Sequence, residues 1–249
     1  MQSARIRRLV YLEAMGVQLW TPRIRVPTLD RGAGEGETAH LFSASGGDAD
    51  ISVLLPKQGS ESCDRAASWE ALQLEVAACS ACPLHQSRIQ TVFGVGDRRA
   101  SWMVIGEAPG EQEDVQGEPF VGRAGLLLNE MLRAIGLRRE QVYIANILKC
   151  RPPKNRDPQA DEAAACESFL KRQLVLVRPR IILAVGRIAA QNLLKTTTPI
   201  GKLRGVVHDY EQIPLVVTYH PAYLLRSPLE KRKAWDDLRL AVHTYRQST

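Results

Sequence analysis

Short apolar runs that end at a glycine or a turn constrain the fold of this chain more than any other feature of its sequence. Residues 102–105 form such a run and lead into Gly106, and residues 181–185 lead into Gly186, as buried strands do. Segments with helical spacing of apolar residues lie between these runs. Strands that alternate with helices predict an α/β layer fold with a mainly parallel sheet. We expect strands at 102–105, 142–148, 181–185 and 215–219, and helices at 68–78, 124–135, 158–177, 187–194 and 231–245.

The segments that follow the predicted strands carry most of the polar residues that can take part in catalysis or ligand binding. In parallel α/β sheets, ligands bind beyond the carboxyl ends of the strands. Those ends are occupied here by residues 106–110, 146–156, 186–187 and 220–221. We therefore expect one edge of the sheet to hold a ligand site.

Four of the five cysteines indicate a metal site. Cys79 and Cys82 form a CxxC pair, and Cys150 and Cys166 follow after intervals of 67 and 15 residues. A CxxC turn lets two thiolates reach one metal centre, and distant segments can supply the other two. Zinc and an iron–sulfur cluster both satisfy this set, although the long interval is unusual for a small zinc module. Scattered buried thiols are the alternative; Cys63 has no partner in the pattern, although it can serve as an alternative ligand.

Composition and charge limit the kind of partner and the cellular compartment that we expect for the protein. Lys and Arg outnumber Asp and Glu by 33 to 27, and this net charge of +6 is compatible with a polyanion partner. The 45% hydrophobic content supports a core without disulfide staples. No apolar stretch is long enough to span a membrane, and no signal peptide is recognisable. We expect a cytoplasmic protein, in which paired cysteines more often bind metal than form disulfides.

The first 64 residues differ from the rest of the chain. Residues 5–20 can form a short basic amphipathic helix, and residues 31–50 are rich in Gly, Ala, Ser and Asp without apolar periodicity. We interpret residues 1–64 as an N-terminal extension that is partly a disordered linker. Residues 65–249 form the predicted folded domain.

Five motifs lie within about residues 65–246: Cys79-x-x-Cys82, Gly106-Glu107-Ala108-Pro109-Gly110, Gly117-x-Pro119-Phe120-Val121-Gly122, Ala145-Asn146-x-x-Lys149-Cys150-Arg151-Pro152-Pro153-x-Asn155-Arg156 and His220-Pro221-Ala222-Tyr223-Leu224-Leu225-Arg226. Together they resemble the family 4 uracil-DNA glycosylases. The resemblance implies a three-layer α/β/α fold around a central four-stranded parallel sheet, with a [4Fe–4S] cluster on Cys79, Cys82, Cys150 and Cys166. It also implies a monomeric base excision repair enzyme that removes uracil from single- or double-stranded DNA and leaves an abasic site.

Three residues of these motifs suit the recognition of uracil and the stabilisation of its anion. Phe120, in a loop flanked by glycines, can stack on a flipped pyrimidine, unless it is an ordinary core residue. Asn146 has the donor and acceptor that pair with the amide edge of uracil and reject cytosine, although an Asn can also cap a turn. The resemblance implies that His220 donates to uracil O2 as negative charge develops, and a neutral imidazole is sufficient for this.

The residue that places the attacking water is less well defined by the motifs. Other branches of the superfamily carry an Asp in the first motif, as GQDPYH, whereas this chain has Glu107 one position away. Glu107 is therefore the expected catalytic carboxylate, with Glu113 and Asp114 as alternatives. Backbone amides near Ala108 can share in binding the base. No lysine stands out as a Schiff-base nucleophile, which favours a glycosylase without strand cleavage.

Basic and apolar residues of the last two motifs are candidates for contact with DNA. The basic loop can bind phosphates, unless it is only a solvated charged segment. Leu224, Leu225 and Arg226 can insert into the duplex in place of the flipped base, and residues 122–125 open a helix that can hold a phosphate. The basic residues are Lys149, Arg151, Lys154 and Arg156.

Three alternative hypotheses remain open. An enzyme that captures uracil-DNA covalently through a histidine in the basic loop is disfavoured, because residues 151–156 contain none. A non-catalytic DNA-binding module of the same fold would leave uracil in DNA. A zinc-stabilised scaffold would be colourless, whereas an iron–sulfur protein is brown and absorbs at about 400 nm.

Overall fold

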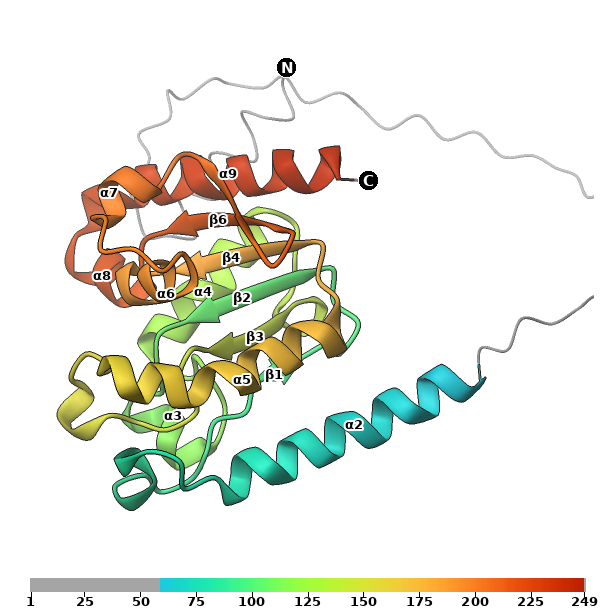
Figure 1. Ribbon diagram of the computed structural model, residues 1–249. Coiled ribbons are helices and arrows are strands. Elements are labelled where there is room, and N and C mark those ends of the chain that lie inside the picture. Colours follow the sequence, from blue (N-terminus) through green and yellow to red (C-terminus); the bar gives the residue numbers. More distant parts are fainter. Residues whose placement is uncertain (1–58, 249) are drawn as a thin grey trace, which may run out of the picture.

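The computed structural model describes residues 59–248 (Figure 1). The helix expected at residues 5–20 and the linker expected at 31–50 lie outside this range. Helix α2 (Gly59–Ala78) crosses the predicted boundary at residue 64 and extends the helix expected at 68–78. The division into an extension and a domain therefore stays a prediction.

The middle layer of the molecule is a six-stranded sheet with the strand order β1-β3-β2-β4-β6-β5. The four inner strands are parallel, whereas β1 and β5 pair antiparallel with their neighbours at the two edges. The parallel centre was predicted correctly, but the total of four strands was wrong. The strands are β1 (Val95–Gly96), β2 (Trp102–Gly106), β3 (Tyr143–Asn146), β4 (Ile181–Val185), β5 (Val207–Tyr210) and β6 (Ile213–Thr218).

The two edge strands were missed for a physical reason. Strand β1 is two residues long, and β5 reads Val-His-Asp-Tyr with only its last residue buried. Neither has the continuous apolar run that marks an inner strand buried on both faces. All positions of β2, β3 and β4 are buried, so these strands were recognisable in the sequence.

Helices cover both faces of the sheet, because alternate residues of each inner strand point to opposite sides. On one face, Ile182 and Ala184 of β4 pack with helices α2, α5 and α6. On the other, Ile181 and Leu183 pack with α4 and α9. Figure 1 shows α5 and α6 in front of the sheet and α4 behind it. The helices of the layers are α3 (Glu111–Gln116), α4 (Arg123–Ala134), α5 (Ala160–Val177), α6 (Arg187–Leu193), α7 (Ile200–Leu203), α8 (Pro221–Arg226) and α9 (Lys231–Gln247), with 3₁₀ turns η1 (Pro83–Gln86), η2 (Arg139–Gln141), η3 (Pro153–Asn155) and η4 (Pro228–Glu230).

The parallel strands all end at the same edge of the sheet, where the arrowheads point in Figure 1. Register pairs Gly106 at the end of β2 with Asn146 at the end of β3, and Val185 of β4 with Thr218 of β6. Segments far apart in the sequence therefore meet at this edge. Among the described helices, none combines the length and apolar character that crossing a membrane requires.

Candidate active site and cysteine cavity

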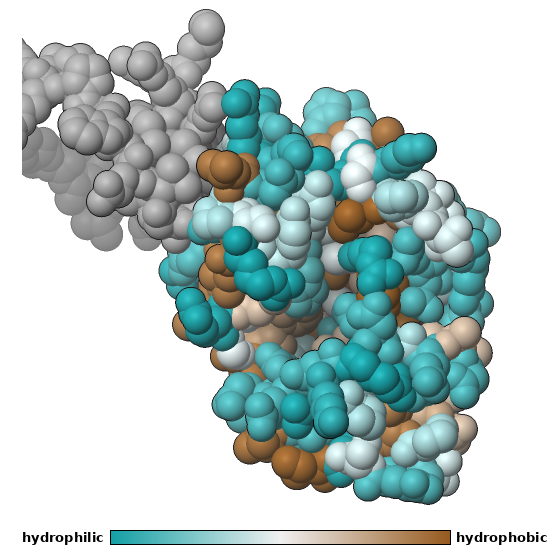
Figure 2. Space-filling model, turned by 90° about the vertical axis from the view of Figure 1, so that its left-hand side faces the viewer, coloured by the Kyte–Doolittle hydropathy of each residue, from teal (hydrophilic) through white to brown (hydrophobic). Residues whose placement is uncertain are grey.

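A cleft opens at the carboxyl edge of the four parallel strands. Figure 2 faces this side of the molecule and shows it hollowed, with apolar surface inside and hydrophilic residues on the rim. Its volume is about 760 Å³, within the range of pockets that hold small organic ligands. The five residues predicted for catalysis and base binding, which come from four segments, all line this cleft: Glu107, Ala108, Phe120, Asn146 and His220.

Phe120 and His220 form the stacked walls of the cleft. Their ring centroids lie 5.5 Å apart with an interplanar angle of 29°. Phe120 is 6% exposed and has a φ of 56°, in the left-handed region that few residues other than glycine adopt. A Cβ at Gly106 would lie 2.6 Å from Phe120 Cζ and 2.4 Å from Asn146 Oδ1. Glycine at the end of β2 therefore allows the ring and the amide to approach each other.

Arg139, in the turn before β3, holds the loop that carries Phe120. Its Nη1 donates to Phe120 O at 3.1 Å, and its Nη2 donates to Pro119 O. A Cβ at Gly125 would lie only 1.8 Å from Phe120 O, so the helix behind the loop must have glycine there. Two donors on consecutive carbonyls thus fix the left-handed conformation of Phe120. Sequence analysis missed Arg139, because it lies outside every recognised motif.

Glu113 holds the other side of the same loop. Its Oε1 accepts hydrogen bonds from the backbone N–H groups of Val121 at 3.0 Å and Gly122 at 3.3 Å. This carboxylate, which also lines the cleft, is therefore already engaged as a structural acceptor. The other alternative base, Asp114, is 1% exposed and accepts from the N–H of Ile89 at 3.0 Å, away from the cleft.

Asn146 presents a buried amide to the cleft. The side chain is 2% exposed, and within residues 59–248 no donor lies within hydrogen-bond distance of Oδ1. A buried polar atom without a partner costs on the order of 1–3 kcal/mol, so such atoms mark places where a ligand supplies the hydrogen bond. Asn146 therefore points to a ligand with a donor at this position.

His220 follows β6 and caps the N-terminus of α8. Its Nδ1 accepts from the backbone N–H of Ala222 at 3.2 Å, which places the proton of the neutral imidazole on Nε2. The pKa of His220 is lowered to about 4, mainly by burial and also by Arg226, while Glu113 opposes the shift. At neutral pH the side chain is thus an uncharged hydrogen-bond donor.

Glu107 is the first residue after β2, and its carboxyl group is an unusually weak acid. Burial raises the pKa of its carboxyl from 4.5 to about 7, with a further contribution from Asp157 and opposition from Arg187. Arg187 Nη2 pairs with Asp157 Oδ2 at 2.6 Å, beside Glu107 at the same cleft. Glu107 can therefore both accept and release a proton near neutral pH, as a general base must.

The predicted DNA-contact residues of the basic loop have different surroundings. Lys149 is 1% exposed, and its Nζ donates to Asn146 O at 2.9 Å and Gln173 Oε1 at 2.6 Å. Its ammonium group lies inside the protein, where a DNA phosphate cannot reach it. Arg156 forms a bidentate pair with the buried Glu162, through Nη1 at 2.9 Å and Nη2 at 2.5 Å.

Two other basic residues of the loop lie nearer to solvent. Arg151 is partly buried, and its Nε donates to Asn155 Oδ1 at 2.8 Å. Lys154 is exposed, and both Lys154 and Asn155 have positive φ angles of 55° and 53°. Two consecutive non-glycine residues with positive φ indicate a loop whose strained backbone conformation is maintained by the surrounding structure.

Helix α8 carries the remaining predicted DNA contacts. Arg226 is exposed and lines the cleft. Leu224 is fully buried and packs in the core with α4 and α9, so insertion into DNA does not fit its position. Its neighbour Leu225 is 37% exposed. The helical repeat turns one leucine inward and the next outward, which the sequence motif alone did not resolve.

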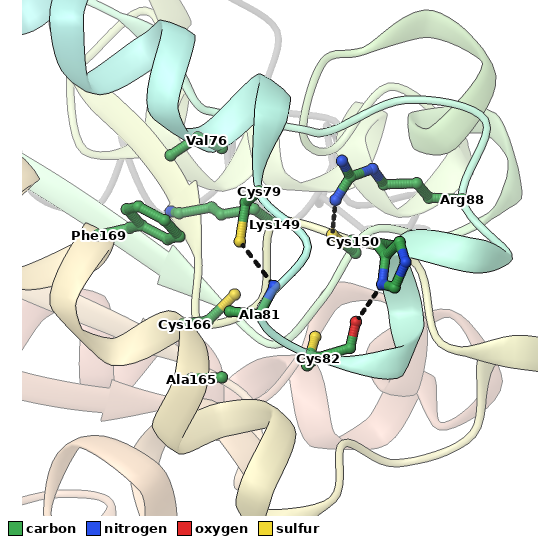
Figure 3. A pocket seen from close by; sticks show the side chains of 11 residues that line it. Val76, Cys79, Ala81, Cys82, Arg88, Lys149, Cys150, Ala165, Cys166 and Phe169 are labelled. Atoms are coloured by element: carbon green, nitrogen blue, oxygen red, sulfur yellow. Dashed lines mark hydrogen bonds between the residues drawn. The ribbon is translucent and has the colours of Figure 1, made fainter.

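The four predicted metal ligands line one cavity on the α2–α5 side of the sheet (Figure 3). Cys79 and Cys82 follow α2 and are partly exposed, whereas Cys150 and Cys166 are 4% exposed. In Figure 3 their sulfur atoms surround a common space. Across the described residues, no three His, Cys, Asp or Glu side chains are grouped as a site for a single metal ion.

Arg88 places a positive charge beside the sulfur atoms. Its Nη1 donates to Cys150 Sγ at 3.0 Å, and its Nη2 donates to Ala77 O at 3.0 Å. Burial raises the pKa of the Cys150 thiol, while Arg88 lowers it; burial also raises the pKa of Cys166 to about 11. Arg88 was not predicted, because a single arginine after a CxxC pair carries no recognisable signal.

Comparison with known proteins places these two sites in a family context. The sequence profile of the Uracil DNA glycosylase superfamily matches residues 93–239. The type-4 uracil-DNA glycosylase of Archaeoglobus fulgidus is 48% identical over 162 residues, which cover 62% of this chain and 81% of that protein. The type-4 uracil-DNA glycosylase of Thermotoga maritima is 46% identical over 160 residues, covering 64% and 83%. A type-5 uracil-DNA glycosylase of Pyrobaculum aerophilum is 35% identical over 147 residues, covering 52% and 64%.

Proposed function

This chain belongs to the uracil-DNA glycosylase superfamily and to its type-4 branch, and we propose that it removes uracil from DNA by hydrolysing the bond between the base and the deoxyribose. The observation that carries the proposal is the unpaired, buried Oδ1 of Asn146, next to the stacked rings of Phe120 and His220. A planar base with a hydrogen-bonding edge fits this arrangement. Such a base must first leave the duplex, at a cost of roughly a few kcal/mol.

Asn146 and Phe120 recognise the flipped base. The N3–H of uracil donates to Asn146 Oδ1, and the amide nitrogen of Asn146 donates to O4 of the base. Cytosine offers an acceptor at N3 and a donor at N4, so it would leave the buried amide unpaired. Phe120 stacks on the pyrimidine, a contact worth roughly 1–3 kcal/mol. Arg139 and Glu113 position Phe120 by holding its loop from both sides.

His220 stabilises the leaving group. As the bond between C1′ and N1 breaks, its electron pair moves onto the uracil ring and negative charge develops at O2. The Nε2–H of neutral His220 donates a hydrogen bond to that oxygen, because Ala222 N–H already occupies Nδ1. A neutral donor of this kind suits the low pKa of His220.

Glu107 orients and activates the water. The water oxygen forms a bond to C1′ of the deoxyribose, and its proton passes to the Glu107 carboxylate. The departing uracil anion later takes up a proton from solvent, which leaves free uracil and an abasic site. The pKa of Glu107 near 7 means that a substantial fraction of the carboxylate is ready to accept this proton at neutral pH.

DNA is held beside the cleft by residues that reach solvent. We assign phosphate contacts to Lys154, Arg151 and Arg226, and insertion into the space left by the base to Leu225. Lys149 is buried and donates to Asn146 O and Gln173 Oε1, and Arg156 pairs with the buried Glu162, so both residues instead shape the loop. Leu224 anchors α8 in the core.

The cysteine cavity fits a [4Fe–4S] cluster as a structural group. Four thiols from three segments line one cavity, which is the ligand set of a cluster in which each thiolate binds a different iron. Arg88 offsets the negative charge of such a site. When bound, the cluster would supply bonds that tie Cys79, Cys82, Cys150 and Cys166 together. No step of the hydrolysis passes through it.

The test is excision from a labelled oligonucleotide with one uracil. The parent protein should release free uracil and leave an alkali-labile strand, whereas His220→Ala should be slower by roughly 10²–10³-fold, the effect of removing one donor to a developing anion. A parent protein that binds the oligonucleotide but leaves uracil in place would overturn the proposal and favour the non-catalytic module. A strand that stays attached to the protein on a denaturing gel would favour covalent capture.

A further inference from the structure

Two tyrosines that the proposed mechanism does not use form an aromatic pair in the wall of the cleft. Tyr219 precedes His220, and Tyr223 lies one helical turn after it, with its N–H donating to His220 O at 2.9 Å. The two ring centroids are 5.0 Å apart with an interplanar angle of 41°. Both residues line the cleft, and Tyr223 is 36% exposed. The pair therefore adjoins the residue assigned to the leaving group and reaches solvent at the rim.

Arg204 braces this pair from the protein side. Its guanidinium lies 4.7 Å from the centre of the Tyr219 ring, and its Nε and Nη2 each lie 2.8 Å from a carboxylate oxygen of Asp237. Asp237 is fully buried, and Arg204 Nη2 also donates to Lys233 O. A bidentate pair held in this way fixes the plane of the guanidinium. The Tyr219 ring thus contacts both the fixed guanidinium of Arg204 and the ring of Tyr223.

We infer that Tyr223, supported by Tyr219 and Arg204, is a stacking platform for the nucleobase next to the uracil in a single-stranded substrate. The inference rests on the proposed function, because that function places the uracil at His220. Aromatic side chains in a groove bind successive bases of single strands irrespective of sequence, since every base has a π-face. In a duplex the neighbouring base is already paired and stacked, so the platform contributes less there.

The test uses a single-stranded oligonucleotide with 2-aminopurine beside a 2′-fluorinated uracil nucleotide that resists hydrolysis. The 2-aminopurine probe is placed on the 5′ side of the uracil in one oligonucleotide and on the 3′ side in another. Stacking on Tyr223 should quench the fluorescence of the probe on the side that faces Tyr223 when the parent protein binds. Tyr223→Ala should lose the quenching, and Tyr223→Phe, which keeps the ring, should retain it. With a cleavable uracil substrate, Tyr223→Ala should raise KM for the single strand by about 10-fold and for the duplex by much less.

Leu229→Ala is the control for loss of exposed apolar surface, since Leu229 is 93% exposed near the end of α8 and should change neither signal. Equal quenching and equal KM in Tyr223→Ala and the parent would overturn the inference and leave the proposed function intact. If the parent excises no uracil but quenches the probe on binding, and Tyr223→Ala does not quench it, the proposed function would be overturned and the platform supported.

Discussion

The cleft and the cysteine cavity meet at one strand end but depend on different properties of the chain. Asn146, the last residue of β3, faces the cleft, and Cys150, four residues later, faces the cysteine cavity. Lys149 connects them, because it lines the cysteine cavity while its Nζ donates to Asn146 O. The cavity depends on the identity of four side chains. The cleft depends on backbone conformation as well, at Phe120 and at the glycines that let it approach.

This difference separates a structural role, at the cysteine cavity, from a catalytic role, at the cleft. We propose that the cysteine cavity, with a cluster bound, fixes the strand end, whereas the proton transfers and hydrogen bonds of the proposed hydrolysis all belong to the cleft. Damage to the cavity should therefore affect folding and activity together. Damage to the cleft should reduce activity without loss of folding, and the following predictions test that distinction.

The largest effect is expected from Cys150→Ser. We expect little folded protein, loss of absorbance at about 400 nm and loss of uracil excision together, because a structural metal site contributes directly to folding. Soluble yield, visible absorbance and excision are measured on the same preparation. A colourless, well-folded variant with full activity would show that the cavity does not hold the strand end.

The sequence predicted most of the cysteine cavity and only part of the cleft. Cysteines have few roles in such a pattern, so Cys79, Cys82, Cys150 and Cys166 could be grouped without a structure. Residues at strand ends were also predictable, because the topology brings them to one edge. The contribution of Arg139 depends on the left-handed φ of Phe120, and the burial of Lys149 and Leu224 depends on which way a turn faces. Neither property has a signature in a short motif.

The second prediction concerns the loop that carries Phe120. Arg139→Ala removes both donors from the carbonyls of Pro119 and Phe120, so the ring is no longer held over the base. We expect kcat to fall by roughly 10²-fold, the usual effect of misplacing a group in a site by about 1 Å. Arg139→Lys, which supplies a single donor group, should recover part of the loss.

Arg180→Ala is the matched control for Arg139→Ala. Its Nη2 donates to the carbonyl of Ser248, and its guanidinium lies 5.0 Å from the Tyr245 ring, away from the cleft. We expect it to change thermal stability but not kcat. If both variants lost kcat in proportion to their loss of Tm, Arg139 would have only a general structural role.

The third prediction is the pH dependence of excision. With the pKa of Glu107 near 7, the rate should rise with pH through about pH 7, as the carboxyl loses its proton and becomes a base. Glu107→Gln should be slow and should lack this rise. An unchanged profile in Glu107→Gln would assign the base to another group.

Glu107 should also lower the stability of the protein above its ordinary pKa. Folding raises that pKa from 4.5 to about 7, so the folded state binds more protons than the unfolded state between these values. Stability attributable to this group therefore falls as the pH rises through this window, and the full penalty is present above about pH 7. The Tm of Glu107→Gln should exceed that of the parent by more at about pH 8 than at about pH 4.

The smallest effect is expected at the rim of the cleft. Lys154→Ala should weaken binding to DNA of any sequence by a few-fold and reduce the slope of log affinity against log salt by about 1. Lys149→Met removes a buried amine that cannot contact phosphate, so it should leave the salt slope unchanged. Binding titrations at several salt concentrations compare the two variants. Equal slopes in parent and Lys154→Ala would remove Lys154 from the DNA contacts.

The most direct test of the division between the two regions is Asn146→Ala, measured for single-turnover excision and visible absorbance in one sample. Asn146 lies on the same strand end that Cys150 anchors, but its side chain faces the cleft. We predict that excision falls by roughly 10²-fold or more, the scale of losing one precisely placed hydrogen-bonding group, while the absorbance at about 400 nm stays that of the parent and the Tm does not fall. Excision at the parental rate, or loss of the absorbance together with the activity, would contradict the account.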